Sequence, residues 1–128
     1  MPNKTAEDMT AYMQPAKEGL SELCRRFSNM PVAFTEVGTR SCHGSIMLPY
    51  NILWDSYYDA EEQANYMEAI FRTFSENPYW MGLFWWKWDE TQNRPQYHGD
   101  PSGDRGFTIQ GKPAEEIMKK WISKNRNL

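Results

Sequence analysis

A carboxylate at the end of an apolar run is the first feature of this sequence that could do chemistry. Residues 31–38 read Pro-Val-Ala-Phe-Thr-Glu-Val-Gly, so Glu36 follows a stretch typical of a buried strand and precedes a glycine. In α/β enzymes the active site gathers where such strands end. We therefore expect Glu36 to face a cleft. On the residues alone, it could also cap the following turn or pair with Arg40.

Aromatic side chains are the second feature. They make up 15% of the residues and include six tryptophans, more indoles than a domain of this size needs for packing alone. Trp85 and Trp86 are adjacent in an apolar run, so on a strand one would pack in the core and the other would face a cleft. Tyr50, Trp54 and Trp88 fall in expected loops, where each could stack on a ligand or pack the loop.

Metal, cofactor and thiol chemistry have little support in the sequence. Cys24 and Cys42 form neither a metal-binding spacing nor a disulfide framework, which suits a reducing compartment. His43 and His98 lie far apart in sequence, and no third ligand has a matching spacing. We expect no bound metal and no cofactor.

Charge and hydropathy exclude several classes of partner. The chain has 128 residues, with 14 Lys and Arg against 17 Asp and Glu, and its basic residues are scattered. This pattern predicts no binding to nucleic acid or to an acidic membrane surface. The first residues contain no apolar signal core, and no run is long enough for a membrane helix, so a cytoplasmic location is the expectation. The length indicates one domain, residues 1–128.

Periodicity predicts the elements that must position these side chains. Apolar residues at three- to four-residue intervals predict a helix over 5–27, interrupted near Pro15 and Gly19, and another over 59–76 with Asp59 as its cap. Near-continuous apolar runs predict strands over 31–37 and 80–88, covered on both faces as in a parallel sheet. Pro113 followed by carboxylates predicts a last helix over 113–123.

The expected order is therefore helix, strand, helix, strand, helix, with unequal loops. Connections entering the strands are short, whereas those leaving the strands are about twenty residues long, the length at which loops are usually functional. In a βα array the long loops collect at the carboxyl ends of the strands, where the active site lies. This asymmetry places Glu36 at the functional end of the sheet.

Four motifs in the sequence resemble those of a known protein family. They are Phe-Thr-Glu-Val-Gly-Thr-Arg-Ser at 34–41, Glu-Glu-Gln-Ala at 61–64 leading into Tyr66, Gly-Leu-Phe-Trp-Trp-Lys-Trp at 82–88, and Gln-Gly-Lys-Pro-Ala-Glu at 110–115. As an ordered set, they resemble the carboxyl-terminal part of a glycoside hydrolase family 113 β-mannanase, within the clan of retaining glycosidases built on (β/α)8 barrels. The resemblance implies a partial barrel whose two parallel strands match the seventh and eighth.

The resemblance also implies roles for residues. A retaining glycosidase needs two carboxyl groups about 5 Å apart, a nucleophile and an acid/base. Glu36 matches the nucleophile that ends strand seven, while the acid/base ends strand four, which this chain does not contain. Trp86 matches the tryptophan that lines the floor of the cleavage subsite. The further candidates for binding a β-mannan-like oligosaccharide are Trp88, Trp54, Tyr50 and Arg40.

Two parallel strands with three helices cannot close a barrel, so we expect little or no hydrolysis by the chain alone. Three hypotheses remain. The chain could be the carboxyl-terminal portion of a mannanase-like glycosidase that is completed by an amino-terminal barrel portion. It could be a noncatalytic carbohydrate-binding module. It could also self-associate, with copies burying one another's open sheet edges, which is compatible with either of the others.

Overall fold

A computed structural model describes residues 4–89 and 100–126 of the chain. His98 and part of the loop between the second strand and the last helix lie outside the described residues. The order is α1 (Ala6–Tyr12), α2 (Gln14–Arg26), β1 (Val32–Val37), α3 (Ala60–Phe74), β2 (Trp80–Trp85) and α4 (Pro113–Arg126), with short 3-10 turns at Ser45–Met47 and Pro101–Gly103. None of the described helices is both long and apolar enough to cross a membrane.

The segment expected as one helix over 5–27 is two helices that meet at Met13. Met13 ends α1 and precedes α2, and its carbonyl accepts from the amides of Ala16 and Lys17. Pro15 has no amide hydrogen to continue the ladder of α1, and its fixed φ suits the first turn of a new helix. The interruption expected near Pro15 is therefore a break between two helices, whereas Gly19 lies inside α2 and does not interrupt it.

The two strands form a parallel sheet whose register shifts twice, once between Val32 and Ala33 and once next to Glu36. Phe34 pairs with Leu83 and Val37 pairs with Trp85, so two residues of β1 lie opposite one residue of β2. The extra residue is a bulge, which re-aims the side chains that follow it. It falls at Thr35 and Glu36, and both are exposed.

The second strand is shorter than the expected 80–88. It ends at Trp85, after which the Trp86 amide still donates to the Val37 carbonyl at 2.7 Å and the Lys87 amide turns to the Phe107 carbonyl. The backbone of residues 86–88 therefore leaves the sheet for the neighbouring loop, and Trp88 is not a strand residue.

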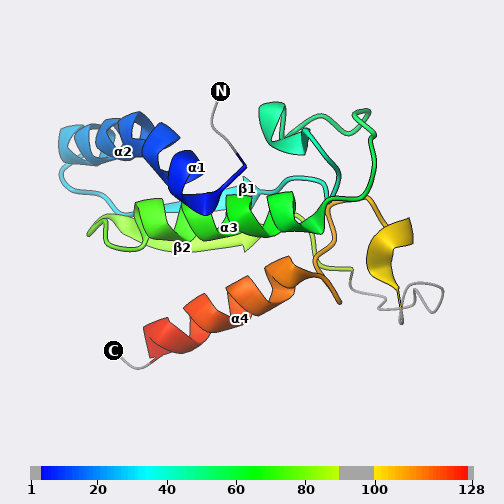
Figure 1. The fold of residues 1–128 in the computed structure, drawn as a ribbon. Helices are drawn as coiled ribbons and strands as arrows, with labels where there is room; N and C mark the ends of the chain where they lie inside the picture. Colours follow the sequence, from blue (N-terminus) through cyan, green and yellow to red (C-terminus); the bar gives the residue numbers. More distant parts are fainter. Residues whose placement is uncertain (1–3, 90–99, 127–128) are drawn as a thin grey trace.

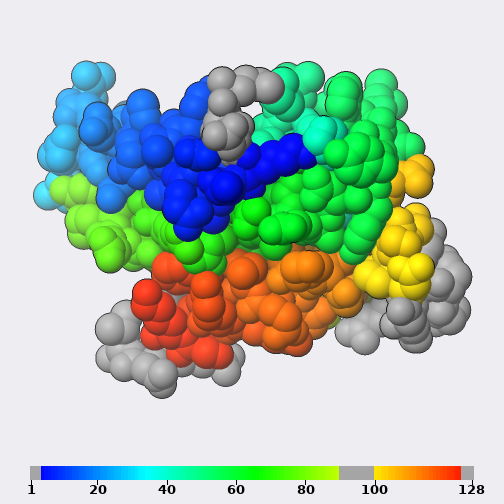
Figure 2. All heavy atoms as spheres, viewed as in Figure 1, coloured from blue at the N-terminus to red at the C-terminus, as the bar shows by residue number. Residues whose placement is uncertain are grey.

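The helices form one layer against the sheet. Figure 1 shows α3 lying along the strands, with α1 and α4 on its two sides, and Figure 2 shows these three helices as a continuous surface. The Asp59 side chain caps α3 by accepting from the Glu62 amide, as the sequence predicts. The loop that follows β1 and the described parts of the loop that follows β2 gather at the carboxyl ends of the strands (Figure 1).

The core lies between α3, α4 and β2. Its buried members are Ala64, Met67, Phe71, Ile109, Ala114 and Trp121. Phe71 and Trp121 stack with ring centroids 5.4 Å apart and an interplanar angle of 8°. Because helix α4 reaches the sheet through these rings, aromatic packing fixes the position of the last helix.

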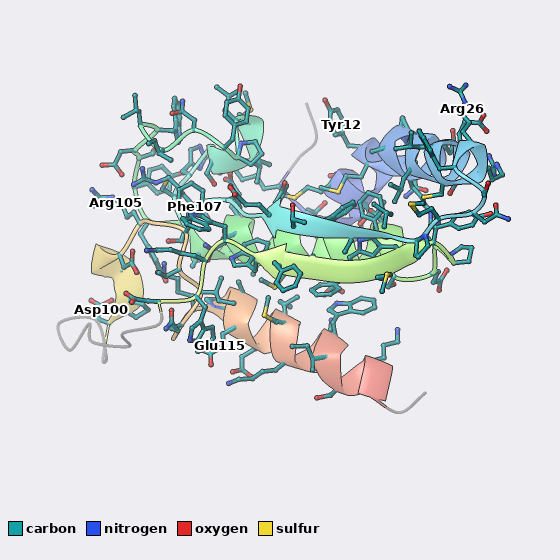
Figure 3. All side chains as sticks on the ribbon, turned by 180° about the vertical axis from the view of Figure 1, so that it is seen from behind. Tyr12, Arg26, Asp100, Arg105, Phe107 and Glu115 are labelled. Atoms are coloured by element: carbon teal, nitrogen blue, oxygen red, sulfur yellow. The ribbon has the colours of Figure 1, made fainter. Side chains whose placement is uncertain are left out.

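The other face of the sheet is open in the part of the chain that the structure describes. Seen from behind in Figure 3, both strands lie in front of the helix layer, and no described helix covers them. Phe84 of β2 is 69% exposed, whereas its neighbours Leu83 and Trp85 pack against the core on the opposite face. Helices on one face of a parallel sheet and an open apolar face on the other are the arrangement that the expected partial (β/α)8 barrel requires, with the open face lining the barrel interior.

Candidate functional site

The candidate site is a cavity of about 260 Å³ at the carboxyl ends of the two strands. Its lining comes from both strand ends, the loop after β1, helix α3 and the loop before α4. The lining residues are Glu36, Val37, Gly38, Pro49, Tyr50, Ile52, Tyr66, Trp86 and Phe107.

Glu36 reaches this cavity because of the bulge in β1. Phe34, two residues earlier, points into the helix layer and packs edge-on against Phe74 with centroids 4.9 Å apart. Strict alternation would turn Glu36 to that same buried face. The extra residue breaks the alternation and leaves the carboxylate exposed. Among the described residues, Glu36 makes no hydrogen bond or ion pair with any other side chain, so its oxygens are available to a ligand.

Trp86 is held beside Glu36 by main-chain contacts. Its amide donates to Val37, and its carbonyl lies 2.1 Å from the point where a Cβ on Gly38 would be. A glycine is therefore required at position 38 for the two strand ends to approach this closely. Trp85 packs against the buried core, while Trp86 is half exposed and lines the cavity. The indole lies within the same cavity as the carboxylate.

Three more aromatic residues line the cavity. Tyr50 was expected from the sequence, whereas Tyr66 and Phe107 were not. Tyr50 is 78% exposed on the loop after β1. Tyr66 comes from α3, and burial raises the pKa of its phenol, so this side chain is a neutral hydrogen-bond donor. Phe107 comes from the loop before α4 (Figure 3). An isolated aromatic in a polar loop was the available signal for Phe107, whereas the helical spacing of Tyr66 hid it among core positions.

The structure does not bring Arg40, Trp54 or Trp88 into the cavity lining. The Arg40 guanidinium donates to the carbonyls of Ile52 and Arg105 and lies 3.8 Å from Asp55, so it joins two loops. The expected alternative of an Arg40 pair with Glu36 is not found among the described residues. Arg40 instead supports the wall, because Ile52 lines the cavity.

Trp54 packs against its own loop. Its indole nitrogen donates to the His43 carbonyl at 2.9 Å, and the ring closely covers Gly44, which has a positive φ of 80°. Trp88 is 44% exposed just beyond the sheet. Sugar stacking by these two residues stays a prediction that the geometry of the cavity does not support.

A buried lysine joins the loop after β1 to the loop before α4. The Lys112 ammonium is fully buried, donates to the Ser41 hydroxyl at 3.0 Å and the Thr108 carbonyl at 2.7 Å, and lies 3.5 Å from the Asp104 carboxylate. A buried charge with these partners holds both loops in one arrangement. Phe107 is thereby positioned next to the loop that follows Glu36.

Two alternative chemistries can be weighed at this end of the molecule. Burial raises the pKa of the Cys42 thiol, which keeps it protonated and unsuited to act as a nucleophile. His43 lies near the carboxylates of Asp59 and Glu62 outside the cavity lining. The open cavity thus presents one carboxylate among aromatic faces, an arrangement suited to a sugar ring.

The family follows from comparison with known proteins. A model of glycoside hydrolase family 113 matches residues 6–112. The chain belongs to glycoside hydrolase family 113. A search of curated proteins gave no significant match.

Solved structures agree with the family. The chain is similar to the family 113 β-mannanase AaManA from Alicyclobacillus acidocaldarius in complex with ManMIm, with 26% identity, a TM-score of 0.77, and coverage of 89% of this chain and 36% of that one. A second family 113 β-1,4-mannanase matches at 26% identity and a TM-score of 0.60, with coverage of 73% and 29%. A β-1,4-mannanase complex at 23% identity, TM-score 0.65 and coverage of 80% and 32% shows the fold alone.

The chain therefore spans about a third of the length of these family 113 structures. The prediction of a partial (β/α)8 barrel with parallel strands is confirmed, as is the resemblance to family 113.

Proposed function

We propose that this family 113 chain supplies one wall of a β-mannan-binding cleft, with Glu36 as the nucleophile of a retaining glycosidase and Trp86 as the platform for the sugar. The observation that carries the proposal is that Glu36 and Trp86 line one cavity at the carboxyl ends of adjacent parallel strands. The β-mannanase named for the similar structure supports mannan as the substrate class.

The geometry also supports inactivity of the chain alone. Double displacement needs a second carboxyl group about 5 Å from the first. Of the described residues that line the cavity, Glu36 is the only carboxylate. An acid/base must therefore come from the amino-terminal portion of a barrel, which would also cover the open face of the sheet.

Complementation tests this proposal. The chain is mixed with the amino-terminal portion of a family 113 β-mannanase, association is followed by native mass spectrometry, and release of mannose oligomers from β-1,4-mannan oligosaccharides is measured. We expect hydrolysis only in the mixture. Glu36→Gln should remove it, whereas Glu61→Gln on the exposed side of α3 should not. An inert mixture of folded, associated portions would contradict the proposal.

A second candidate is a noncatalytic carbohydrate-binding module, favoured by the single carboxylate among aromatic lining residues. It predicts that the chain alone binds mannan oligosaccharides by calorimetry, with affinity unchanged by Glu36→Gln and lost in Trp86→Ala. If the completed barrel hydrolyses mannan oligosaccharides and Glu36→Gln abolishes this hydrolysis, the glycosidase proposal is correct and the binding-module proposal is wrong.

A further inference from the structure

Three metal-ligating side chains converge outside the cavity that Glu36 lines. They are His43 from the loop after β1, Asp59 at the cap of α3 and Glu62 in the first turn of α3, and one ligand atom from each lies within 4.8 Å of the others. His43 Nδ1 is 3.5 Å from Asp59 Oδ2 and 4.0 Å from Glu62 Oε2. One imidazole nitrogen and two carboxylate oxygens are ligands that zinc and similar ions accept.

Backbone amides hold both carboxylates in place. Asp59 uses Oδ1 to accept from the Glu62 amide, which leaves Oδ2 directed toward the other groups. Glu62 accepts from the amides of Gly44 and Ile46 at 3.0 and 3.2 Å, and its side chain is 0% exposed. Hydrogen bonds of this kind orient the ligands of metal sites.

The imidazole of His43 is also fixed in position. Its ring stacks on Tyr57, with centroids 4.5 Å apart and an interplanar angle of 23°, and the Tyr57 hydroxyl lies 2.6 Å from Nδ1. Rotation of the ring is therefore restricted. Because the Tyr57 hydroxyl and the Lys4 ammonium both contact Nδ1, an ion that binds this nitrogen must displace both of them.

A cation of the protein already occupies the centre of this group. The Lys4 ammonium lies 2.9 Å from Glu62 Oε2 and 3.2 Å from Asp59 Oδ2, and it contacts His43 Nδ1. Two carboxylates and one ammonium together carry a net charge of −1. The Lys4 side chain is 41% exposed and stands just before α1, so it can move into solvent while the buried Glu62 cannot.

We propose that His43, Asp59 and Glu62 bind a divalent transition-metal ion of the zinc class, and that Lys4 competes with this ion for the same position. A divalent ion would neutralise both carboxylates, which Lys4 alone does not. The three protein ligands would leave one tetrahedral position for water. His43 belongs to the loop that carries Tyr50, and Asp59 and Glu62 belong to the start of α3, so a bound ion would fasten that loop to α3.

The competition gives a test with the whole chain. Zn²⁺ binding is measured by calorimetry and Co²⁺ binding by visible absorption, for the natural sequence, Lys4→Met and the matched control Lys17→Met on α2. Removing the competing charge should tighten metal binding at least about tenfold in Lys4→Met, with no change in Lys17→Met. Equal affinity in Lys4→Met and the natural sequence would overturn the proposal.

Ligand variants on the Lys4→Met background identify the site. Asp59→Asn keeps the helix cap, because asparagine caps as well as aspartate, but removes the charge, and His43→Gln removes the imidazole. Each should weaken Zn²⁺ binding at least about tenfold and abolish the Co²⁺ spectrum, with helicity followed by circular dichroism. If Asp59→Asn fails to fold, His43→Gln decides. Unchanged metal affinity in folded His43→Gln would overturn the proposal.

Discussion

At the scale of single residues, the exposure of Glu36 depends on one extra residue in β1. The bulge at Thr35 and Glu36 turns the carboxylate away from the buried face that holds Phe34. The sequence could place Glu36 at the end of a strand, because an apolar run followed by glycine is a strong signal. It could not predict the bulge, since pairing register depends on the partner strand. The cavity contacts of Phe107 could not be predicted either, because they depend on how two loops far apart in the sequence fold against each other.

The contact between Gly38 and Trp86 gives a prediction about stability. In Gly38→Ala the new methyl would meet the Trp86 carbonyl, so the strand ends must separate. We expect the free energy of unfolding to fall by about 1–3 kcal/mol, measured by urea denaturation.

Gly19→Ala is the matched control for this substitution. Nothing lies within 4 Å of the new methyl, and the residue is inside helix α2. This variant should gain about 0.5–1 kcal/mol. Equal stability of Gly38→Ala and the natural sequence would show that the strand ends are less closely packed than described.

Glu68 gives a prediction about pH. Burial alone would raise the pKa of its carboxyl, but hydrogen bonds from Trp121, Lys120 and Arg72 together lower it below the ordinary value of 4.5. The stability that this carboxylate contributes is therefore present above the unfolded-state pKa and is lost as pH falls through the lower folded-state pKa.

Glu68→Gln tests this dependence. At pH 7 the variant should be less stable by about 1–3 kcal/mol, and the difference should shrink as the pH is lowered below 4.5. Urea midpoints across this range provide the measurement, with Glu61→Gln on the same helix as control. A difference that is independent of pH would contradict the role of the charge.

At the scale of elements, periodicity located the helices and strands, but sequence signals were weaker at their ends. Asp59 marked the start of α3 correctly because its side chain makes the capping hydrogen bond. The break at Met13 was only suggested by Pro15. The end of β2 at Trp85 was missed because Trp86 and Trp88 continue the aromatic pattern after the backbone has turned toward Phe107.

The docking of α4 on α3 gives a prediction at this scale. Trp121 stacks on Phe71 and donates from its indole nitrogen to Glu68 at 2.8 Å. Trp121→Ala should cost about 3–5 kcal/mol and release α4, seen as faster amide hydrogen exchange in that helix. Trp121→Phe keeps a stacked ring and loses only the hydrogen bond, so it should cost less. Equal losses in the two variants would show that stacking does not hold the helix.

At the scale of the whole molecule, the sheet has only two described strands and one uncovered apolar face. Each strand has an edge without a partner strand among the described residues. Such edges and apolar faces are sites of association in folded proteins. The presence of two strands could be predicted from the two apolar runs in the sequence. What covers the open face could not, because no local sequence pattern describes a partner.

This open face predicts self-association when no complementing portion is present. Light scattering of the 15.1 kDa chain should show a mass that rises with concentration in the micromolar range. Phe84→Glu on the open face should shift the chain toward monomer. Leu53→Glu, at an 86% exposed loop position, is the control and should not. A monomer at all concentrations would contradict this prediction.

The main-chain contact between the ends of β1 and β2 has a consequence for protein engineering. Glu36 and Trp86 are joined through Val37 and Gly38, all within this chain, so their spacing should not change when a different amino-terminal portion is supplied. Under the proposed function, different amino-terminal portions can then be compared with this chain held constant, and any difference in sugar preference between them would come from the exchanged portion.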